Sequence, residues 1–241
     1  MNRILPFITC LWLALLPVRA EDLFSLGTAA YRAGDYVQAA QAFQKLADAH
    51  PSSGVLQNLG NAEWQRGETG TAILAWERAL WLDPFQEAAH NNLLYVRKVA
   101  QLDTPQLGWH EVISSWLPVN WWAWITGGSF WTAVLMASLP GILRWRRAPW
   151  QQGLAALALM VFLLSIPAHF GVDSRARLGF VLQKETPLRL SPTFDAQSLT
   201  RLTAGEPVHT VRARGDYLLV RTSRALGWVA RTEVGFISPR P

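Results

Sequence analysis

A repeat of 33 residues near the N-terminus is the feature that most constrains how this chain can fold. Similar residues recur at this spacing, in the pairs Leu23 and Leu56, Leu26 and Leu59, Gly27 and Gly60, Gly34 and Gly67, Ala39 and Ala72, Phe43 and Trp76, and Pro51 and Pro84. The pattern predicts helical hairpins that stack, because each hairpin can bury its apolar face only against a neighbour.

The residue types and the period resemble the tetratricopeptide (TPR) repeat, whose period is about 34 residues. We expect a TPR repeat domain over residues 22–102, with two hairpins and a third helix that caps the stack. Gly27 and Gly60 are expected where the partner helix crosses, and Gly34 and Gly67 at turns with a positive φ. Since about three repeats are usually required, an array this short needs support from a partner, the membrane or the C-terminal domain.

The concave face of such an array is the expected partner-binding surface. Its candidate residues are Tyr31, Gln57, Asn61, Trp64 and Arg97. An exposed pair of Tyr31 and Trp64 would anchor a peptide, whereas half-buried packing of both rings is the alternative. Asn61 with Arg97 and Lys98 suggests a clamp for a peptide carboxylate, although that pattern is incomplete.

Residues 1–20 are expected to be a secretory signal peptide. Arg3 supplies the positive charge, a short apolar run follows, and Ala20 precedes the expected cleavage site. An uncleaved membrane anchor is the alternative. The single cysteine, Cys10, lies in this segment, so we expect a mature chain without disulfides or cysteine-based metal sites.

Two long uncharged runs, residues 121–143 and 150–171, predict a transmembrane hairpin. At a rise of 1.5 Å per residue, the first run spans roughly 34 Å, which is enough for a bilayer. Arg144, Arg146 and Arg147 lie in the short loop between the runs and place that loop in the cytoplasm. Both large domains are then expected on the extracytoplasmic side of a bacterial inner (cytoplasmic) membrane, as the predicted signal peptide also requires.

The segment 103–120 is expected to be an amphipathic linker that lies in the bilayer interface. Apolar residues recur there at helical spacing, namely Trp109, Val112, Ile113, Trp116 and Leu117. Tryptophans cluster from Trp109 to Trp150, as in an interfacial belt. His169 is the only candidate for an ionisable group inside the hairpin, and we expect it at the interface.

Residues 179–238 contain short apolar runs separated by turn residues, which predict about five strands in a small β-barrel. The barrel resembles the bacterial SH3 family in the order of its motifs, which are Leu188-Arg189 before Pro192, Leu202 before Gly205, Gly215-Asp216-Tyr217 before Val220, and Gly227-Trp228-Val229. The resemblance implies an SH3-like fold that binds cell-wall peptides or protein segments. Tyr217 and Trp228 are its candidate groove residues, and packing in the barrel core is the alternative.

The whole order of segments resembles the BatE proteins of bacterial aerotolerance operons. The fold class is then multidomain, with TPR helical hairpins, a two-helix transmembrane hairpin and a C-terminal SH3-like β-barrel. The resemblance implies a membrane complex with proteins that carry von Willebrand factor A domains and with a MoxR-type ATPase. It implies a protein-binding scaffold and no enzymatic activity.

The distribution of charge and motifs gives little reason to expect chemistry or nucleic-acid binding. The net charge of +5 combines −5 over residues 21–115 with +5 over residues 172–241 and the arginines that flank the membrane segments. We find no Gly-rich phosphate loop, His/Cys metal cluster or nucleophile elbow, and we expect no cofactor. A scaffold is the first hypothesis, and a sensor or anchor that binds peptidoglycan is the alternative.

Overall fold

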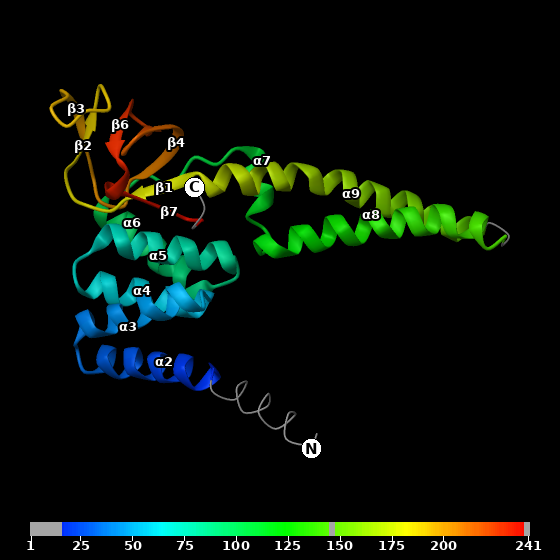
Figure 1. The fold of residues 1–241 in the computed structure, drawn as a ribbon, viewed down its shortest axis with the longest axis horizontal. Helices are drawn as coiled ribbons and strands as arrows, with labels where there is room; N and C mark the ends of the chain where they lie inside the picture. The colour runs from blue at the N-terminus through cyan, green and yellow to red at the C-terminus, as the bar shows by residue number, and fades with distance from the viewer. Residues whose placement is uncertain (1–15, 145–147, 239–241) are drawn as a thin grey trace, which may run out of the picture.

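The computed structural model describes residues 16–144 and 148–238 of the 241-residue chain. Stacked helices and a sheet lie at one end of the described part, and a long two-helix hairpin projects away from them (Figure 1). The predicted signal peptide falls outside the described residues, except for residues 16–20, which belong to the first helix that the structure describes.

Five helices in the N-terminal half form the stack, and their sequence signals agree with their bounds. They are α2 (Leu16–Arg32), α3 (Tyr36–Ala49), α4 (Ser53–Gln65), α5 (Thr69–Leu82) and α6 (Glu87–Ala100). The side chain of Asp35 caps α3 by accepting from the backbone N–H of Gln38, and Ser52 caps α4 in the same way. Gly34 and Gly67 turn the chain between paired helices with φ of +80° and +81°, as expected.

The two repeated glycines allow the helices of each hairpin to approach closely. A Cβ atom at Gly27 would lie 2.8 Å from the Phe43 ring, and one at Gly60 would lie 2.5 Å from Nε1 of Trp76. Phe43 and Trp76 are both 2% exposed, so each ring fills the space that a glycine leaves. The 33-residue spacing therefore reflects one packing contact that occurs twice.

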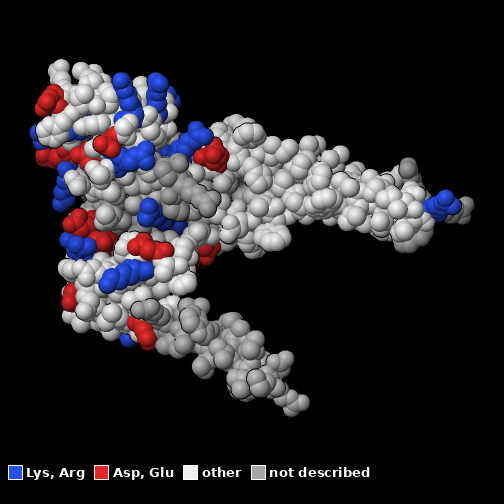
Figure 2. Space-filling view, in the orientation of Figure 1, with Lys and Arg blue, Asp and Glu red and all other residues white. Residues whose placement is uncertain are grey.

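The projecting hairpin consists of α8 (Val119–Ile142) and α9 (Pro149–Ala176), close to the two predicted runs. Both helices are long and apolar enough to cross a membrane. Their most apolar windows are only 11% and 22% buried, unlike those of a core helix, and their surface is uncharged up to the tip of the hairpin (Figure 2). The arginines at 146 and 147 lie outside the described residues.

Polar side chains join the two helices of the hairpin. The hydroxyl of Thr126 on α8 lies 2.8 Å from Ser165 Oγ and 2.6 Å from His169 Nε2, both on α9. Interhelical hydrogen bonds of this kind stabilise helix pairs in a lipid environment. His169 is therefore a partner in hairpin packing.

The linker before the hairpin, which we expect to lie in the bilayer interface, also packs against the protein. Its only described helix, α7 (Trp109–Ser114), packs along α9 and buries Glu111 and Ser114 there. Trp109 and Trp116 are exposed at 68% and 62%. The polar side of the linker therefore packs against the protein, and these two tryptophans are exposed on its outer side.

The C-terminal part forms a seven-stranded antiparallel sheet, with more strands than the sequence suggested. The strands are β1 (Leu178–Val181), β2 (Thr186–Arg189), β3 (Ser198–Leu202), β4 (Pro207–Arg214), β5 (Tyr217–Arg221), β6 (Leu226–Ala230) and β7 (Val234–Phe236), in the spatial order β3-β2-β6-β5-β4-β1-β7. A short 3-10 helix, η1 (Arg231–Glu233), connects the last two strands. Leu188, Leu218, Val220 and Val229 lie in the core of the sheet.

The sheet packs directly on the last repeat hairpin. Leu178 and Phe180 of β1 and Ile237, just after β7, belong to the same buried cluster as the repeat helices. Arg78 of α5 donates from Nε to the carbonyl oxygen of Phe236 at 2.9 Å. The support that the short array was expected to need is thus provided, at least in part, by the sheet.

The glycine–aromatic contact makes a testable prediction about stability. Replacing Gly60 with alanine forces the Trp76 ring to move and should lower the free energy of unfolding by about 1–3 kcal/mol. Gly54→Ala in the same helix is the control, because no atom lies within 4 Å of a Cβ there. Circular dichroism during thermal unfolding of the full chain in detergent measures both. Equal midpoints for the two variants would contradict the packing argument.

Candidate binding surfaces on the repeats and the sheet

A groove on the repeats, called the repeat groove below, brings together four of the five predicted partner-binding residues. It has a volume of about 270 Å³, and α2, α4, α5 and α6 all contribute to it. Its lining residues are Tyr31, Gln57, Asn61, Trp64, Gln65, Trp76, Ala88, Asn92 and Tyr95. Because four helices, α2, α4, α5 and α6, meet here, the groove exists only when the hairpins are stacked.

The aromatic side chains of the repeat groove are partly packed and partly available. The sequence left open whether Trp64 and Tyr31 are exposed anchors or half-buried packing residues. Both side chains are half-buried. The Trp64 ring lies 6.5 Å from that of Trp76 and meets Tyr95 edge-on at 6.3 Å. Tyr95 is 61% exposed, and it supplies the accessible aromatic surface.

A pair of asparagines lies beside these rings. The Asn61 Oδ1 atom accepts from Trp76 Nε1 at 3.2 Å and from Asn92 Nδ2 at 2.8 Å. Among the described residues, the Asn61 amide nitrogen and the Asn92 amide oxygen have no hydrogen-bond partner. A donor and an acceptor side by side can pair with one peptide group of a bound chain. Sequence reasoning missed Asn92 and Tyr95, although their spacing of three residues on one helix could have linked them.

The structure does not bring Arg97 into the repeat groove. Arg97 forms an ion pair with Glu77 of α5, and the two side chains are only 14% and 13% exposed. Two residues along a helix correspond to a rotation of about 200°, so Arg97 points away from the side on which Tyr95 lies. The suggested carboxylate clamp of Asn61, Arg97 and Lys98 is therefore not assembled.

The ion pair of Arg97 and Glu77 belongs to a junction where the repeats meet the membrane hairpin. Arg97 and Glu77 share a small cavity with Arg175, the buried arginine in the last turn of α9. The Arg175 guanidinium lies 5.0 Å from the centre of the Trp81 ring on α5. Charged side chains at this junction connect structural elements, which explains their burial without a ligand.

The second predicted surface is on the sheet, where Tyr217 and Trp228 lie on the same face. Tyr217 pairs with Ala230 and Leu219 pairs with Trp228, so the two rings are diagonal neighbours on β5 and β6. Both are half-buried. The Phe194 ring, 80% exposed, adds to this surface from the loop between β2 and β3. We call Phe194, Tyr217 and Trp228 the aromatic face.

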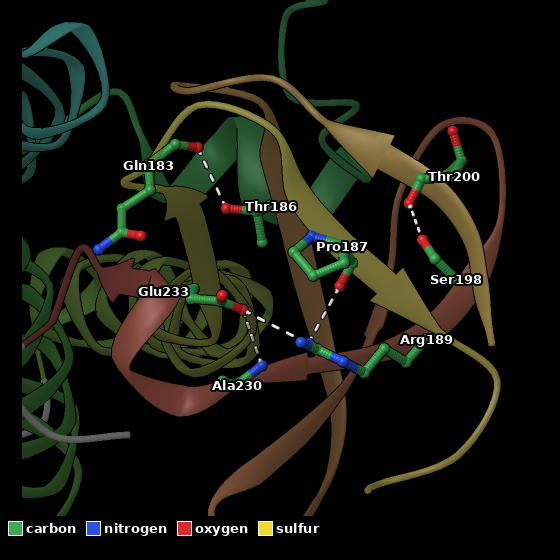
Figure 3. A network of polar contacts seen from close by, with 8 residues as sticks. All are labelled: Gln183, Thr186, Pro187, Arg189, Ser198, Thr200, Ala230 and Glu233. Atoms are coloured by element: carbon green, nitrogen blue, oxygen red, sulfur yellow. Dashed lines mark hydrogen bonds and ion pairs between the residues drawn. The ribbon is translucent and has the colours of Figure 1, made fainter. Parts of the chain in front are cut away.

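The Arg189 side chain lies close to two rings of the aromatic face. Its guanidinium lies 5.9 Å from the ring centres of both Phe194 and Tyr217. Figure 3 shows Arg189 of β2 pointing toward Glu233 of the 3-10 helix, with 3.8 Å between Nη1 and Oε2. The same carboxylate oxygen accepts from the backbone N–H of Ala230 at 3.2 Å. Arg189 is 9% exposed, so its main role is to hold the rings in place.

Perturbed titratable groups in the repeats have structural causes. Burial raises the pKa of Glu63, and the neighbouring Arg66 opposes that change. Burial lowers the pKa of Arg78, and Asp48 opposes it. Within residues 16–144 and 148–238, no three His, Cys, Asp or Glu side chains lie close enough together to hold a metal ion. The expectation that the chain is not an enzyme stays a prediction.

Comparison with known proteins gives one partial similarity. The chain is 36% identical over 84 residues to prolyl 4-hydroxylase subunit alpha-1 of Rattus norvegicus and of Mus musculus. The match covers 32% of this chain and 16% of either relative. No family profile matches the chain. The similarity therefore concerns a segment and does not assign the whole chain to a family.

The position of Arg97 makes a prediction about stability. Arg97→Ala leaves Glu77 without its partner and should lower the free energy of unfolding by about 3 kcal/mol. Lys98→Ala is the control, since Lys98 is exposed and should change the stability by less than about 0.5 kcal/mol. Denaturant unfolding of the full chain measures both variants. If Arg97→Ala were as stable as Lys98→Ala, the ion pair would not hold the repeats together.

Proposed function

We propose that this chain is a membrane-anchored scaffold whose repeats bind a segment of another protein. The observation that carries the proposal is the repeat groove, in which accessible Tyr95 stands beside Trp64 and the asparagine pair. Exposed aromatic rings supply contact area at a low entropic cost, and amide groups satisfy the backbone of a bound peptide. An uncharged groove of this type favours a peptide with apolar side chains over a charged terminus.

The proposed repeats are of the TPR type. The 33-residue period, the two glycine–aromatic contacts and the positive-φ glycines between helices support this assignment. The proposed C-terminal fold is an SH3-like barrel, supported by the order of its motifs and by the antiparallel pairing of β4, β5 and β6. With the membrane hairpin, this order supports the resemblance to BatE proteins.

The proposed partners follow from that resemblance. They are membrane proteins with von Willebrand factor A domains, in a complex of the Bat and MoxR type, beside the lipid bilayer itself. We also propose that both modules face the extracytoplasmic side of a bacterial inner membrane. In support, the repeats and the sheet lie at the same end of the hairpin (Figure 1), and Arg144 lies at the opposite end.

A second candidate function is an anchor or sensor that binds peptidoglycan through the aromatic face. The observation that favours it is the 80% exposure of Phe194 beside the Tyr217 ring. Stacked aromatic side chains can bind the apolar faces of sugars or peptides. This candidate uses a different surface from the repeat groove, so one experiment can separate the two.

The scaffold proposal predicts the effect of a change in the repeat groove. Tyr95→Ala should reduce capture of an extracytoplasmic protein by at least about tenfold, as expected for an aromatic anchor at a protein interface. The measurement is cross-linking in living cells from a photoreactive residue at position 65, where the exposed Gln65 lines the groove outside the asparagine pair, with mass spectrometry of the products. The matched control is Phe85→Ala, since Phe85 is 65% exposed but does not line the groove.

The products identify which candidate function is right. An A-domain membrane protein captured by the wild type and by Phe85→Ala, but not by Tyr95→Ala, would support the scaffold. Capture that Tyr95→Ala leaves unchanged would overturn the groove assignment. Cell-wall fragments captured from a photoreactive residue at position 194, with no protein captured from position 65, would favour the peptidoglycan anchor.

The proposed topology predicts which positions are accessible from outside. A cysteine at Leu226, which is 50% exposed on β6, should react with an impermeant maleimide in intact spheroplasts. A cysteine at Arg144, beyond the far end of α8, should react only after permeabilisation. Both variants carry Cys10→Ser, so that each has one thiol. The reverse labelling pattern would show that the topology is inverted.

A further inference from the structure

A cavity lies where the linker and α9 meet the sheet. It has a volume of about 590 Å³, and residues of the linker, α9, β4 and β5 line it. We call it the junction cavity. Five of its lining residues are used below: Asp103, Glu111, Ser174, His209 and Arg221. Neither the repeat groove nor the aromatic face shares any of them.

The position of this cavity along α9 places it near the surface of a bilayer. The hydrocarbon core is about 30 Å thick, which corresponds to roughly 20 residues of helix. Counting from Trp150, the core ends close to Phe170, whose ring is 68% exposed. The polar headgroup layer adds about 5–7 Å, or roughly four residues. Ser174, which lines the cavity, is therefore at the level of the headgroups.

Hydrogen bonds within the protein already engage the acidic side chains around the cavity. Glu111 accepts from the backbone N–H of Gly108 at 2.6 Å and from Ser174 Oγ at 2.5 Å. Asp103 accepts from Ser223 Oγ at 2.9 Å through one of its oxygens. On the outer turn of α9, Asp173 pairs with Arg177. These hydrogen bonds hold the carboxylates of Glu111 and Asp103 toward protein donors and engage only one oxygen of Asp103.

Two hydrogen-bond donors at the sheet side of the cavity lack a protein acceptor. Arg221 has no ion pair or hydrogen bond from its side chain among the described residues, and it stands directly opposite His209 in the β4–β5 register. The next residue, Thr210, pairs with Val220, so its side chain faces the core of the sheet and not the cavity. An arginine and an imidazole on the same face of the sheet suit the oxygen atoms of a phosphate.

We propose that the junction cavity binds the phosphate group of a phospholipid from the adjacent leaflet. Arg221 and His209 donate hydrogen bonds to the phosphate oxygens. The second carboxylate oxygen of Asp103 accepts from the ammonium of an ethanolamine headgroup or a hydroxyl of a glycerol headgroup. Trp109, 68% exposed on α7, lies beside the lipid at the interface. This site does not depend on the repeats binding a partner.

Native mass spectrometry of the full chain in detergent, titrated with defined lipids, tests the proposal. We expect the wild type to retain phosphatidylethanolamine or phosphatidylglycerol, and Arg221→Gln to weaken retention by at least about tenfold. Arg224→Gln is the matched control, because Arg224 is exposed on the same sheet but does not line the cavity. His209→Ala removes the second donor, and we expect it to weaken retention as well.

Competition with free phosphate and comparison of lipids and variants distinguish a phospholipid from a free phosphate ion. Displacement of lipid by millimolar inorganic phosphate would support the phosphate site and assign it to the free ion. Equal retention of phosphatidylcholine, which has no donor in its headgroup, would overturn the role of Asp103. Wild-type retention by Arg221→Gln, or equal losses in Arg221→Gln and Arg224→Gln, would overturn the site. Thermal unfolding confirms that each variant is folded before its retention is interpreted.

Discussion

The close contact between α5 and the sheet is the interaction on which the rest of the structure depends. Glycines on α5 and on the sheet permit this contact. A Cβ atom at Gly70 of α5 would overlap with the carbonyl oxygens of Val181 and Leu182. A Cβ atom at Gly205 or Gly235 would overlap with side chains of α5. The second hairpin is therefore buried on both sides, and Ile73 is completely inaccessible to solvent. Two hairpins gain in this way the neighbour that a longer array would provide.

The same contact determines how the membrane hairpin meets the repeats. Helix α9 ends at Ala176 and β1 begins at Leu178, so a single residue separates the hairpin from the sheet. The stacking of Arg175 on Trp81 and the ion pair of Glu77 with Arg97 then join α9, α5 and α6 around one cavity. Buried charges cost free energy unless they are paired in good geometry, which favours one orientation of the hairpin over others.

This arrangement holds the candidate surfaces at one end of the hairpin. The repeat groove uses α2, α4, α5 and α6, the aromatic face uses β5, β6 and the loop between β2 and β3, and the junction cavity lies between the sheet and α9. The repeats and the sheet stand side by side at the base of the hairpin (Figure 1). In the proposed scaffold, this arrangement holds a protein segment, a cell-wall ligand and a lipid headgroup at fixed distances from the bilayer.

The sequence by itself determined the features that depend on local pattern. The 33-residue period located the hairpins and their glycine–aromatic contacts, the uncharged runs located α8 and α9, and turn residues marked most strands. These features can be predicted from the sequence because helix periodicity, chain reversal and bilayer thickness each require particular residue types within a short segment.

Only the tertiary structure decided which side chains meet across the molecule. Arg97 pairs with Glu77 instead of joining the groove, because the rotation of α6 against α5 sets its direction. Tyr95 and Asn92 enter the groove for the same reason. The contact of Arg78 with Phe236 joins residues 158 positions apart, and the lining of the junction cavity comes from four separate elements. Such contacts depend on how whole helices and the sheet dock, which no local pattern encodes.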